Sequence, residues 1–228
     1  MSFEILKTQK KKMRVFIFSE VTVNGKISFG KNQNSKILME SFNDNDRKYI
    51  HNCRGKVDAI IIGRNTVTID NPQLTNRFGN GKHPDRLVIS NTLDFSLDEE
   101  IFDENAHTIV ITSKINTKNA MVKKIEDLGH ECIIVGETRV DFAELFDILA
   151  KEKKYETVMV EGGGIIISEL LRDKLIDEMF VLRLPVIVCG EDVPEFAEYL
   201  GKEYCNQLKY LESLKYDNFV VERYVLTN

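Results

Sequence analysis

The sequence predicts an α/β fold whose sheet is parallel in the middle and antiparallel at one edge. Short apolar, β-branched segments alternate with amphipathic segments of about ten residues, a pattern typical of β-α-β units around a parallel sheet. The last third differs, because two strand-like segments flank a short turn at residues 215–217, which favours an antiparallel hairpin. Since no repeat or linker separates these parts, we expect one domain over residues 13–228.

The predicted strands are apolar and rich in β-branched residues, and the one before Pro185 ends there because proline lacks an N–H. They lie at residues 14–19, 57–62, 86–89, 108–111, 131–135, 157–160, 178–184, 208–214 and 218–226.

The predicted helices are amphipathic and carry recognisable ends. The first, at residues 45–54, follows the capping candidates Asn43 and Asp44 and ends near Gly55. The others lie at residues 119–128, 141–153 and 165–174. The segment 21–26 is expected to be the loop that leaves the first strand, because its Asn-Gly pair is a strong turn signal.

Composition and charge limit the classes of function. The chain has 228 residues, of which 43% are hydrophobic and 29% charged, and a net charge of -5, which argues against a nucleic-acid groove. Residues 1–12 are basic and are expected to form a solvated tail, and the apolar run at 15–18 is too short for a signal peptide or a membrane span. We therefore expect a cytoplasmic protein that binds neither nucleic acid nor membrane.

Cysteines and histidines predict no metal site. The cysteines are far apart and form no CxxC pair, so we expect buried free thiols at Cys53, Cys132, Cys189 and Cys205. The histidines show no ligand spacing, and solvated or helix-end positions are expected for His51, His83, His107 and His130.

A first candidate site follows the buried strand at 57–62. The strand ends at Gly63, and a hydroxyl, a carboxylate, an Asn-Pro turn and a guanidinium come directly after it: Thr66, Asp70, Asn71, Pro72 and Arg77. Open α/β sheets bind their ligands at the carboxyl ends of their strands, so these residues are expected to line a ligand site.

A second candidate site lies at residues 158–168, VMVEGGGIIIS. A strand delivers Glu161, three glycines make a turn, and a helix begins with unpaired backbone N–H groups, which suit a ligand phosphate. The segment is neither a full Rossmann fingerprint nor a P-loop, because no GxGxxG and no Gly-Lys-Ser/Thr is present. Tight packing between strand and helix is the structural alternative.

These motifs resemble those of one enzyme family. Residues 63–77, GRNTVTIDNPQLTNR, look like the G-x-x-T-x-x-x-D-x-P-x-L-T-x-R signature of the riboflavin-biosynthesis pyrimidine reductases. Residues 160–164, VEGGG, with 175–190, LIDEMFVLRLPVIVCG, resemble the second signature, and 23–28, VNGKIS, is similar to the D-G-K/R segment. The resemblance covers roughly residues 13–226 in the family's order.

The resemblance implies a dihydrofolate-reductase-like, three-layer α/β fold, a homodimer, and NADPH-dependent reduction of a phosphoribosylamino-pyrimidine to its ribitylamino form. The H-x-E and P-C-x-x-C motifs of the zinc deaminase fused to many such reductases do not occur, so we expect a stand-alone reductase. That layout favours the 2,5-diamino-pyrimidinone substrate, with the deaminated aminouracil as the alternative.

The resemblance also assigns roles residue by residue. NADPH, with NADH possible, is expected at Thr66, Asp70, Gly163, Gly164, Ile165, Ile166, Ile167 and Ser168. The phosphorylated pyrimidine is expected at Ser35, Arg54, Leu74, Arg77 and Glu161. Glu161 suits the amide or amine edge of the ring, because an ionised carboxylate accepts hydrogen bonds, and the arginines match phosphate oxygens. Lys26 and Glu161 are the catalytic candidates, with Lys26 binding the opened sugar or protonating the imine nitrogen.

Each assignment has a structural alternative. Asp70 could cap a turn, Thr66 could cap a short helix, and Arg77 could form a surface ion pair. Arg54 could complement a helix dipole. Glu161 has little structural purpose between a buried strand and three glycines, which favours a functional role.

The chain also departs from the family pattern. Asn24 replaces an Asp, and residues 90–94 place Asp94 where a basic residue is usual, near the expected adenosine end of the cofactor. An acid there would disfavour a 2′-phosphate, which leaves NADH open. The usual Gly-Gly after Pro185 is Gly190-Glu191. A dihydrofolate-reductase-like oxidoreductase of another pathway and a non-catalytic nucleotide-binding protein therefore stay as alternatives.

Overall fold

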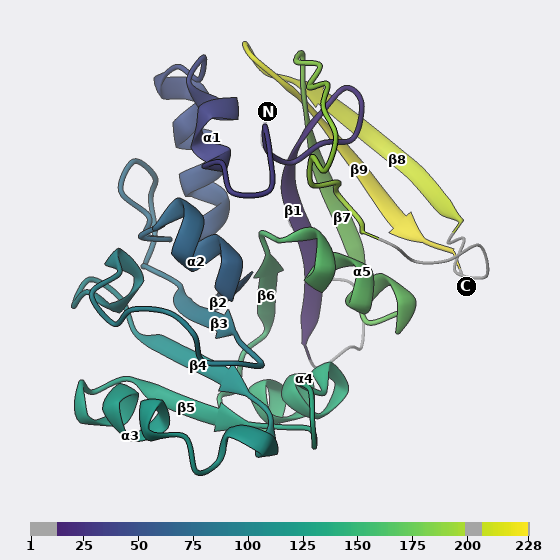
Figure 1. Ribbon diagram of the computed structural model, residues 1–228. Helices are drawn as coiled ribbons and strands as arrows, with labels where there is room; N and C mark the ends of the chain where they lie inside the picture. The colour runs from purple at the N-terminus through teal and green to yellow at the C-terminus, as the bar shows by residue number, and fades with distance from the viewer. Residues whose placement is uncertain (1–12, 199–206, 228) are drawn as a thin grey trace.

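The computed structural model describes residues 13–198 and 207–227, which form a central sheet with helices on both faces (Figure 1). Its strands are β1 (Arg14–Thr22), β2 (Ala59–Gly63), β3 (Asp85–Ile89), β4 (Thr108–Thr112), β5 (Glu131–Ile134), β6 (Thr157–Val160), β7 (Glu178–Leu184), β8 (Leu208–Lys215) and β9 (Val220–Leu226). Its α-helices are α1 (Asp44–Arg54), α2 (Arg64–Asp70), α3 (Ala120–Asp127), α4 (Phe142–Lys151) and α5 (Gly164–Arg172). Short 3-10 helices are η1 (Ser35–Met39), η2 (Glu100–Phe102) and η3 (Lys114–Asn116). The predicted tail at 1–12 lies outside the described residues.

The strand order in the described residues is β5-β4-β3-β2-β6-β1-β7-β9-β8. Neighbouring strands from β5 to β7 run parallel, whereas β9 is antiparallel to both β7 and β8. Figure 1 shows β5 at one edge of the sheet and the yellow hairpin of β8 and β9 at the other. The predicted mixed sheet, with an antiparallel C-terminal hairpin, is confirmed.

Alternating side chains divide the core between the two faces of the sheet. Phe16 of β1 and Ile60 of β2 point to the face covered by α1, α2 and α3. Ile17 and Ile61, the next residues, point to the face covered by α4 and α5 and are fully buried. This alternation is the two-residue period of a strand, and it produces the three layers that the resemblance implied.

Side-chain caps fix where α1 begins. The Asn43 side chain accepts hydrogen bonds from the N–H groups of Asn45 and Asp46, and the Asp46 carboxylate accepts one from the Asn43 N–H. This capping box confirms the predicted start of the helix. It leaves Arg54 in the last turn, beside the sheet.

Two segments differ from the prediction. Residues 21–26 are only partly a loop, since β1 continues through Val21 and Thr22, which pair with β7, and the turn at Gly25 follows. The helix α2 was not predicted, because its sequence RNTVTID is rich in β-branched residues that lower helix propensity. The remaining predicted strands and helices are present, with boundaries shifted by short distances.

The three cysteines within the described residues have free thiols, but these are not all buried. Cys53 and Cys132 are half-buried, whereas Cys189 is exposed, so the prediction of buried thiols is wrong for Cys189. Cys189 lies beyond β7, where the chain has left the sheet and no layer covers it. Cys205 lies outside the described residues.

A membrane-crossing helix is not found in residues 13–198 and 207–227, where every helix is too short or too polar for that purpose.

Candidate functional site

The two candidate sites lie side by side at one edge of the sheet. β2 and β6 are parallel neighbours, with Ile61 opposite Val160, so Gly63 and Glu161 both follow strands that end at this edge. The turns also touch, because a Cβ atom added to Gly63 would lie only 3.1 Å from Ile166 Cδ1. The sheet topology therefore joins the two signatures into one site.

A buried ion pair is the central feature of this site. Arg54, at the end of α1, donates from Nε to Glu161 Oε1 at 2.7 Å and from Nη2 to Oε2 at 2.8 Å. The two side chains are only 15% and 12% exposed. Burial by itself lowers the pKa of Arg54, but the carboxylate of Glu161 outweighs it and holds that pKa above its ordinary value. Arg54 therefore stays charged, and both carboxylate oxygens of Glu161 are fixed as acceptors.

A second carboxylate is anchored in the same way. Ser35 donates to Asp70 from its backbone N–H and from its hydroxyl, each at 2.8 Å, which ties η1 to the end of α2. Asp70 therefore does not cap its own turn. Thr66 lies in the first turn of α2 but does not cap it, because the N-cap is Gly63.

The loop after α2 carries Leu74 and Arg77. Leu74 is buried and adopts a left-handed backbone conformation, with φ of 49°. The exposed Arg77 guanidinium donates to Gln73 and, at 3.1 Å, to Thr75 Oγ1. Its side chain is the more accessible of the two predicted phosphate-binding arginines.

His51 of α1 holds this loop in place. Its Nδ1 accepts a hydrogen bond from the backbone N–H of Arg77 at 3.1 Å. Burial, with the nearby charges of Arg54 and Arg77, lowers the pKa of His51 to about 4, so the ring is neutral and its Nδ1 can accept. A positioning role for this histidine was not predicted, because the partner is a backbone group distant in sequence.

The glycine turn offers room for a ligand. A Cβ atom added to Gly162 or Gly163 would meet nothing within 4 Å, whereas one on Gly164 would lie 2.4 Å from the backbone oxygen of Glu195. Gly163 is the N-cap of α5 and provides no side-chain cap. Open space beside unpaired N–H groups fits a dinucleotide pyrophosphate, since the first N–H groups of a helix have no partner within it.

The rest of the predicted cofactor segment faces inward. Ile166 and Ile167 are buried in the core under α5, and the Ser168 hydroxyl donates to the carbonyl of Gly164 at 2.7 Å. The N–H of Ile167 already donates to the carbonyl of Gly163. Within residues 163–168, only the first turn of α5 is accessible to a ligand. Ile165 in that turn is 51% exposed.

Lys26 lies on the segment that packs against the glycine turn. Its ammonium contacts Glu195 Oε1 at 2.7 Å, and the backbone of Glu195 touches Gly164. Asn24 ties the preceding loop to the segment after β7, because its Nδ2 donates to the carbonyl of Val188 at 2.7 Å and its Oδ1 accepts from the N–H of the same residue. An ionised aspartate could not donate the hydrogen bond to the Val188 carbonyl. This bond is a structural reason for asparagine at position 24.

A guanidinium lies beside the exceptional acid at position 94. Arg64 Nη1 approaches Asp94 Oδ2 at 3.4 Å and donates to the Asp94 carbonyl at 3.1 Å. The unusual acid is therefore matched by a nearby cation.

Glu20 is a site residue that the sequence analysis missed. It is half-buried near the carboxyl end of β1, where it pairs with Leu182 of β7. Burial first, then the carboxylates of Glu161 and Asp70, raise the pKa of Glu20 to about 7, while Arg54 acts in the opposite direction. An acid inside an apolar strand was the available signal, but the predicted strand stopped one residue before it.

The sequence matches a known family along most of its length. The model of the RibD C-terminal domain matches residues 13–221. The chain belongs to the RibD C-terminal domain family.

Curated relatives of this RibD C-terminal domain include two proteins named as 2,5-diamino-6-ribosylamino-4(3H)-pyrimidinone 5′-phosphate reductases. The one from Aquifex aeolicus is 39% identical over 202 residues, which cover 88% of each chain. The one from Archaeoglobus fulgidus is 31% identical over 196 residues, which cover 80% of this chain and 85% of the relative.

Solved structures share the fold. A bifunctional deaminase and 5-amino-6-(5-phosphoribosylamino)uracil reductase of Thermotoga maritima aligns with a TM-score of 0.74 at 23% identity, covering 94% of this chain but 57% of the longer one. The riboflavin biosynthesis reductase of Saccharomyces cerevisiae aligns with a TM-score of 0.70 at 20% identity, covering 97% of this chain and 93% of the yeast chain. At these identities the likeness shows the fold, which confirms the architecture that the resemblance implied.

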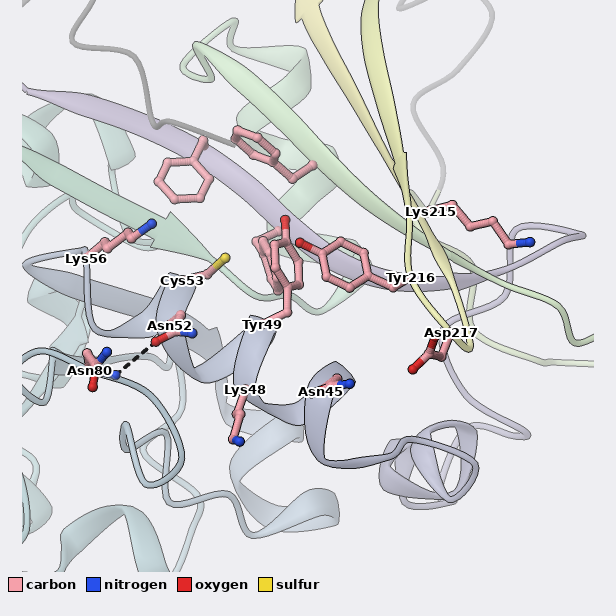
Figure 2. Close-up of a pocket in the computed structure, with 13 residues that line it drawn as sticks. Asn45, Lys48, Tyr49, Asn52, Cys53, Lys56, Asn80, Lys215, Tyr216 and Asp217 are labelled. Carbon is pink, nitrogen blue, oxygen red and sulfur yellow. Dashed lines mark hydrogen bonds between the residues drawn. The ribbon is translucent and has the colours of Figure 1, made fainter. Parts of the chain in front are cut away.

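This RibD C-terminal domain also has a cavity of about 660 Å³ on the other side of α1. Aromatic side chains from β1, α1, β7 and the hairpin turn line part of it: Phe16, Phe18, Tyr49, Phe180 and Tyr216. The rest of its lining is mostly polar and includes Lys215 and Asp217. Figure 2 shows Cys53 and Tyr49 projecting from α1 into it, with Lys48 and Lys56 at its rim. Arg54, Glu161 and Asp70 do not line it, so this cavity is separate from the charged site.

Proposed function

We propose that this chain reduces the ribosylamino side chain of 2,5-diamino-6-ribosylamino-4(3H)-pyrimidinone 5′-phosphate to the ribitylamino form, with a nicotinamide cofactor. The observation that carries the proposal is the buried pair of Arg54 and Glu161, which is placed where the two family signatures meet. It is supported by the relative from Aquifex aeolicus that bears this name and is 39% identical over nearly all of both chains.

The pyrimidine is recognised by fixed acceptors. Glu161 accepts hydrogen bonds from the amine or amide edge of the ring, and Arg54 keeps its carboxylate charged and oriented. Because Arg54 is committed to this carboxylate, Arg77 is the main group for the 5′-phosphate, with Ser35 and Leu74 lining the path between them.

The cofactor lies across the two turns. The open glycine turn and the first N–H groups of α5 hold its pyrophosphate, while Thr66 and Asp70 of α2 face its nicotinamide half. When bound, the nicotinamide supplies a hydride to the sugar carbon of the open-chain imine. Lys26 binds hydroxyls of the opened sugar, after its ammonium leaves Glu195.

NADPH is the proposed cofactor. Arg64 can meet the 2′-phosphate, but the Asp94 carboxylate beside it weakens that attraction. Asp94→Asn is therefore expected to raise the ratio of kcat/KM with NADPH to that with NADH by a few-fold, because this exposed pair is screened by solvent. An unchanged ratio would place the 2′-phosphate elsewhere.

The protein is further proposed to act as a cytoplasmic homodimer. The edge strand β8 supports this assembly, because its exposed apolar side chains Leu208, Tyr210 and Leu211 are 42%, 53% and 38% exposed. Exposed apolar edge strands tend to pair with another chain. Analytical ultracentrifugation of wild type and of Leu211→Lys tests this, with a dimer that weakens in the variant as the expected result.

Turnover with two substrates tests the function. Purified protein, NADPH or NADH, and either the diamino or the deaminated phosphoribosylamino-pyrimidine are mixed, and the product is identified by its gain of two hydrogens. Oxidation with the diamino compound, lost in Glu161→Gln but kept in the exposed control Glu152→Gln, is expected. Cofactor oxidation with the deaminated compound alone would assign the uracil substrate, and none with either would overturn the proposal.

A further inference from the structure

Glu20 is an acid placed among the groups of the proposed site. In the parallel register of β1 and β6, Ile17 lies opposite Val160, so Glu161 follows at the level of Phe18. Phe18 and Glu20 are two residues apart on one strand and therefore face the same side of the sheet. By this register Glu20 lies two residues further toward the ligand edge than Glu161, on the same face.

The groups around Glu20 come from three elements. Glu161 faces it from the end of β6, Arg54 from α1 and Asp70 from α2. Fully ionised, three carboxylates would lie around the guanidinium of Arg54. Nearby His51 adds no charge at neutral pH, because its pKa is lowered to about 4, and the Cys53 thiol adds none, because burial raises its pKa to about 12. One proton held by a carboxyl group relieves this imbalance.

Hydrogen bonding decides which carboxyl group holds the proton. Both oxygens of Glu161 accept from Arg54, and both oxygens of Asp70 accept from Ser35. In the part of the chain that the structure describes, the Glu20 carboxylate accepts a hydrogen bond only from its own backbone N–H. Its second oxygen is left to carry a proton, which matches its pKa of about 7.

We propose that Glu20, in its protonated form, is the acid that gives a proton to the substrate nitrogen during reduction. This inference rests on the proposed function. As the hydride forms the new C–H bond at the sugar carbon, the π electron pair of the C=N bond moves to nitrogen and takes the proton from the Glu20 carboxyl group. The product is a secondary amine, and the Glu20 carboxylate is protonated again by water.

The other acids and bases suit this step less well. Both oxygens of Glu161 and both oxygens of Asp70 already accept hydrogen bonds, and the Lys26 ammonium is paired with Glu195 on the segment beside the glycine turn. Among these groups, Glu20 alone combines a place on the ligand edge with a proton available near neutral pH.

Two readouts test the role of Glu20. Glu20→Gln keeps the size of the side chain but cannot donate an acidic proton, so kcat is expected to fall by about 10²-fold or more. In wild type, kcat falls as the pH rises through about 7, where Glu20 loses its proton, and this limb is expected to disappear in the variant. Glu156→Gln, at the opposite end of the sheet and outside the site, serves as the matched control and keeps both the rate and the limb.

Titration of the carboxyl carbons by NMR gives a readout without turnover. Protein labelled with ¹³C at the glutamate carboxyl carbon is expected to show one resonance that titrates near pH 7 and is missing from Glu20→Gln, whose cofactor binding and circular dichroism stay those of wild type.

An active wild type whose rate and pH profile survive in Glu20→Gln would overturn this inference alone. A wild type that reduces neither pyrimidine would overturn the proposed function, and this inference with it.

Discussion

The two sides of α1 make different kinds of surface. With 3.6 residues per turn, Arg54 and His51 lie on one side, where Arg54 binds Glu161 and His51 accepts from the backbone of Arg77. Tyr49 and Cys53 lie on the other side, beside a cavity of about 660 Å³ that aromatic and polar side chains line together. The cavity has space, but among its described lining residues no arginine holds a buried carboxylate, as Arg54 holds Glu161 on the first side.

The largest expected effect comes from breaking the buried ion pair of Arg54 and Glu161. It tests the contrast between the two sides of α1. Arg54→Met leaves a buried carboxylate, and Glu161→Gln leaves a buried guanidinium, so each is expected to destabilise the protein by about 3 kcal/mol or more. The double variant is expected to lose less than the sum, because neither charge is then uncompensated. Urea unfolding measures all three.

The exposed pair of Lys151 and Asp147 is the matched control. Lys151→Met should cost no more than about 1 kcal/mol, since this pair is 60% and 68% exposed. Equal costs for Arg54→Met and Lys151→Met, or strictly additive effects in the double variant, would contradict the structural role of the buried pair.

Acid is expected to lower the free energy of unfolding through His51, which lies on the same side of α1 as Arg54. The unfolded histidine titrates near 6.5 and the folded one near 4, so between these values the unfolded chain binds more protons and stability falls as the pH falls. At pH 5 the loss from this residue is about 2 kcal/mol relative to pH 7.5. His51→Asn keeps an acceptor for the Arg77 N–H and should flatten this dependence in urea unfolding at the two pH values. A parallel pH dependence in the variant would assign the acid loss to other groups.

Removing the charge of Asp70 at the end of α2 is expected to have a smaller effect, and on kcat/KM. Asp70→Asn weakens both hydrogen bonds from Ser35, and a decrease of about tenfold in kcat/KM is expected because bonds to a charged group are replaced by neutral ones. Asp98→Asn is the control, since Asp98 also accepts from a serine hydroxyl but is exposed. If both variants keep wild-type kcat/KM, Asp70 is not part of the site.

The smallest effect is expected at the cavity. Lys48→Gln and Lys56→Gln neutralise its rim, and kcat/KM for the phosphorylated pyrimidine should change by no more than about twofold, as exposed charges act weakly. A loss of tenfold or more would show that the substrate phosphate lies on this side of α1.

Local patterns predicted most of the fold but only parts of the site. Runs of β-branched residues and capping residues such as Asn43 are signals that lie within a few consecutive residues. The strands and α1 were therefore predicted. α2 was missed because its short, β-branched sequence is held by its place between β2 and the Asp70 contacts rather than by helix propensity.

The pairing of Arg54 with Glu161 could be found only from the folded structure. Arg54 and Glu161 were each predicted from a motif, but they are 107 residues apart and their pairing depends on β2 and β6 being neighbours. Glu20 was missed because the predicted strand ended one residue before it, although β1 continues through it. The carboxylates that raise its pKa come from two other elements, and such contacts between distant elements leave no local pattern in a sequence.

A crystal structure with the phosphorylated pyrimidine and oxidised cofactor is the most direct test of the proposed site. We expect the pyrimidine edge on Glu161, the 5′-phosphate on Arg77 and the cofactor pyrophosphate on the turn at Gly163, with the cavity beside Tyr49 empty of substrate. Substrate bound between Tyr49 and Tyr216, with the pair of Arg54 and Glu161 untouched, would contradict it.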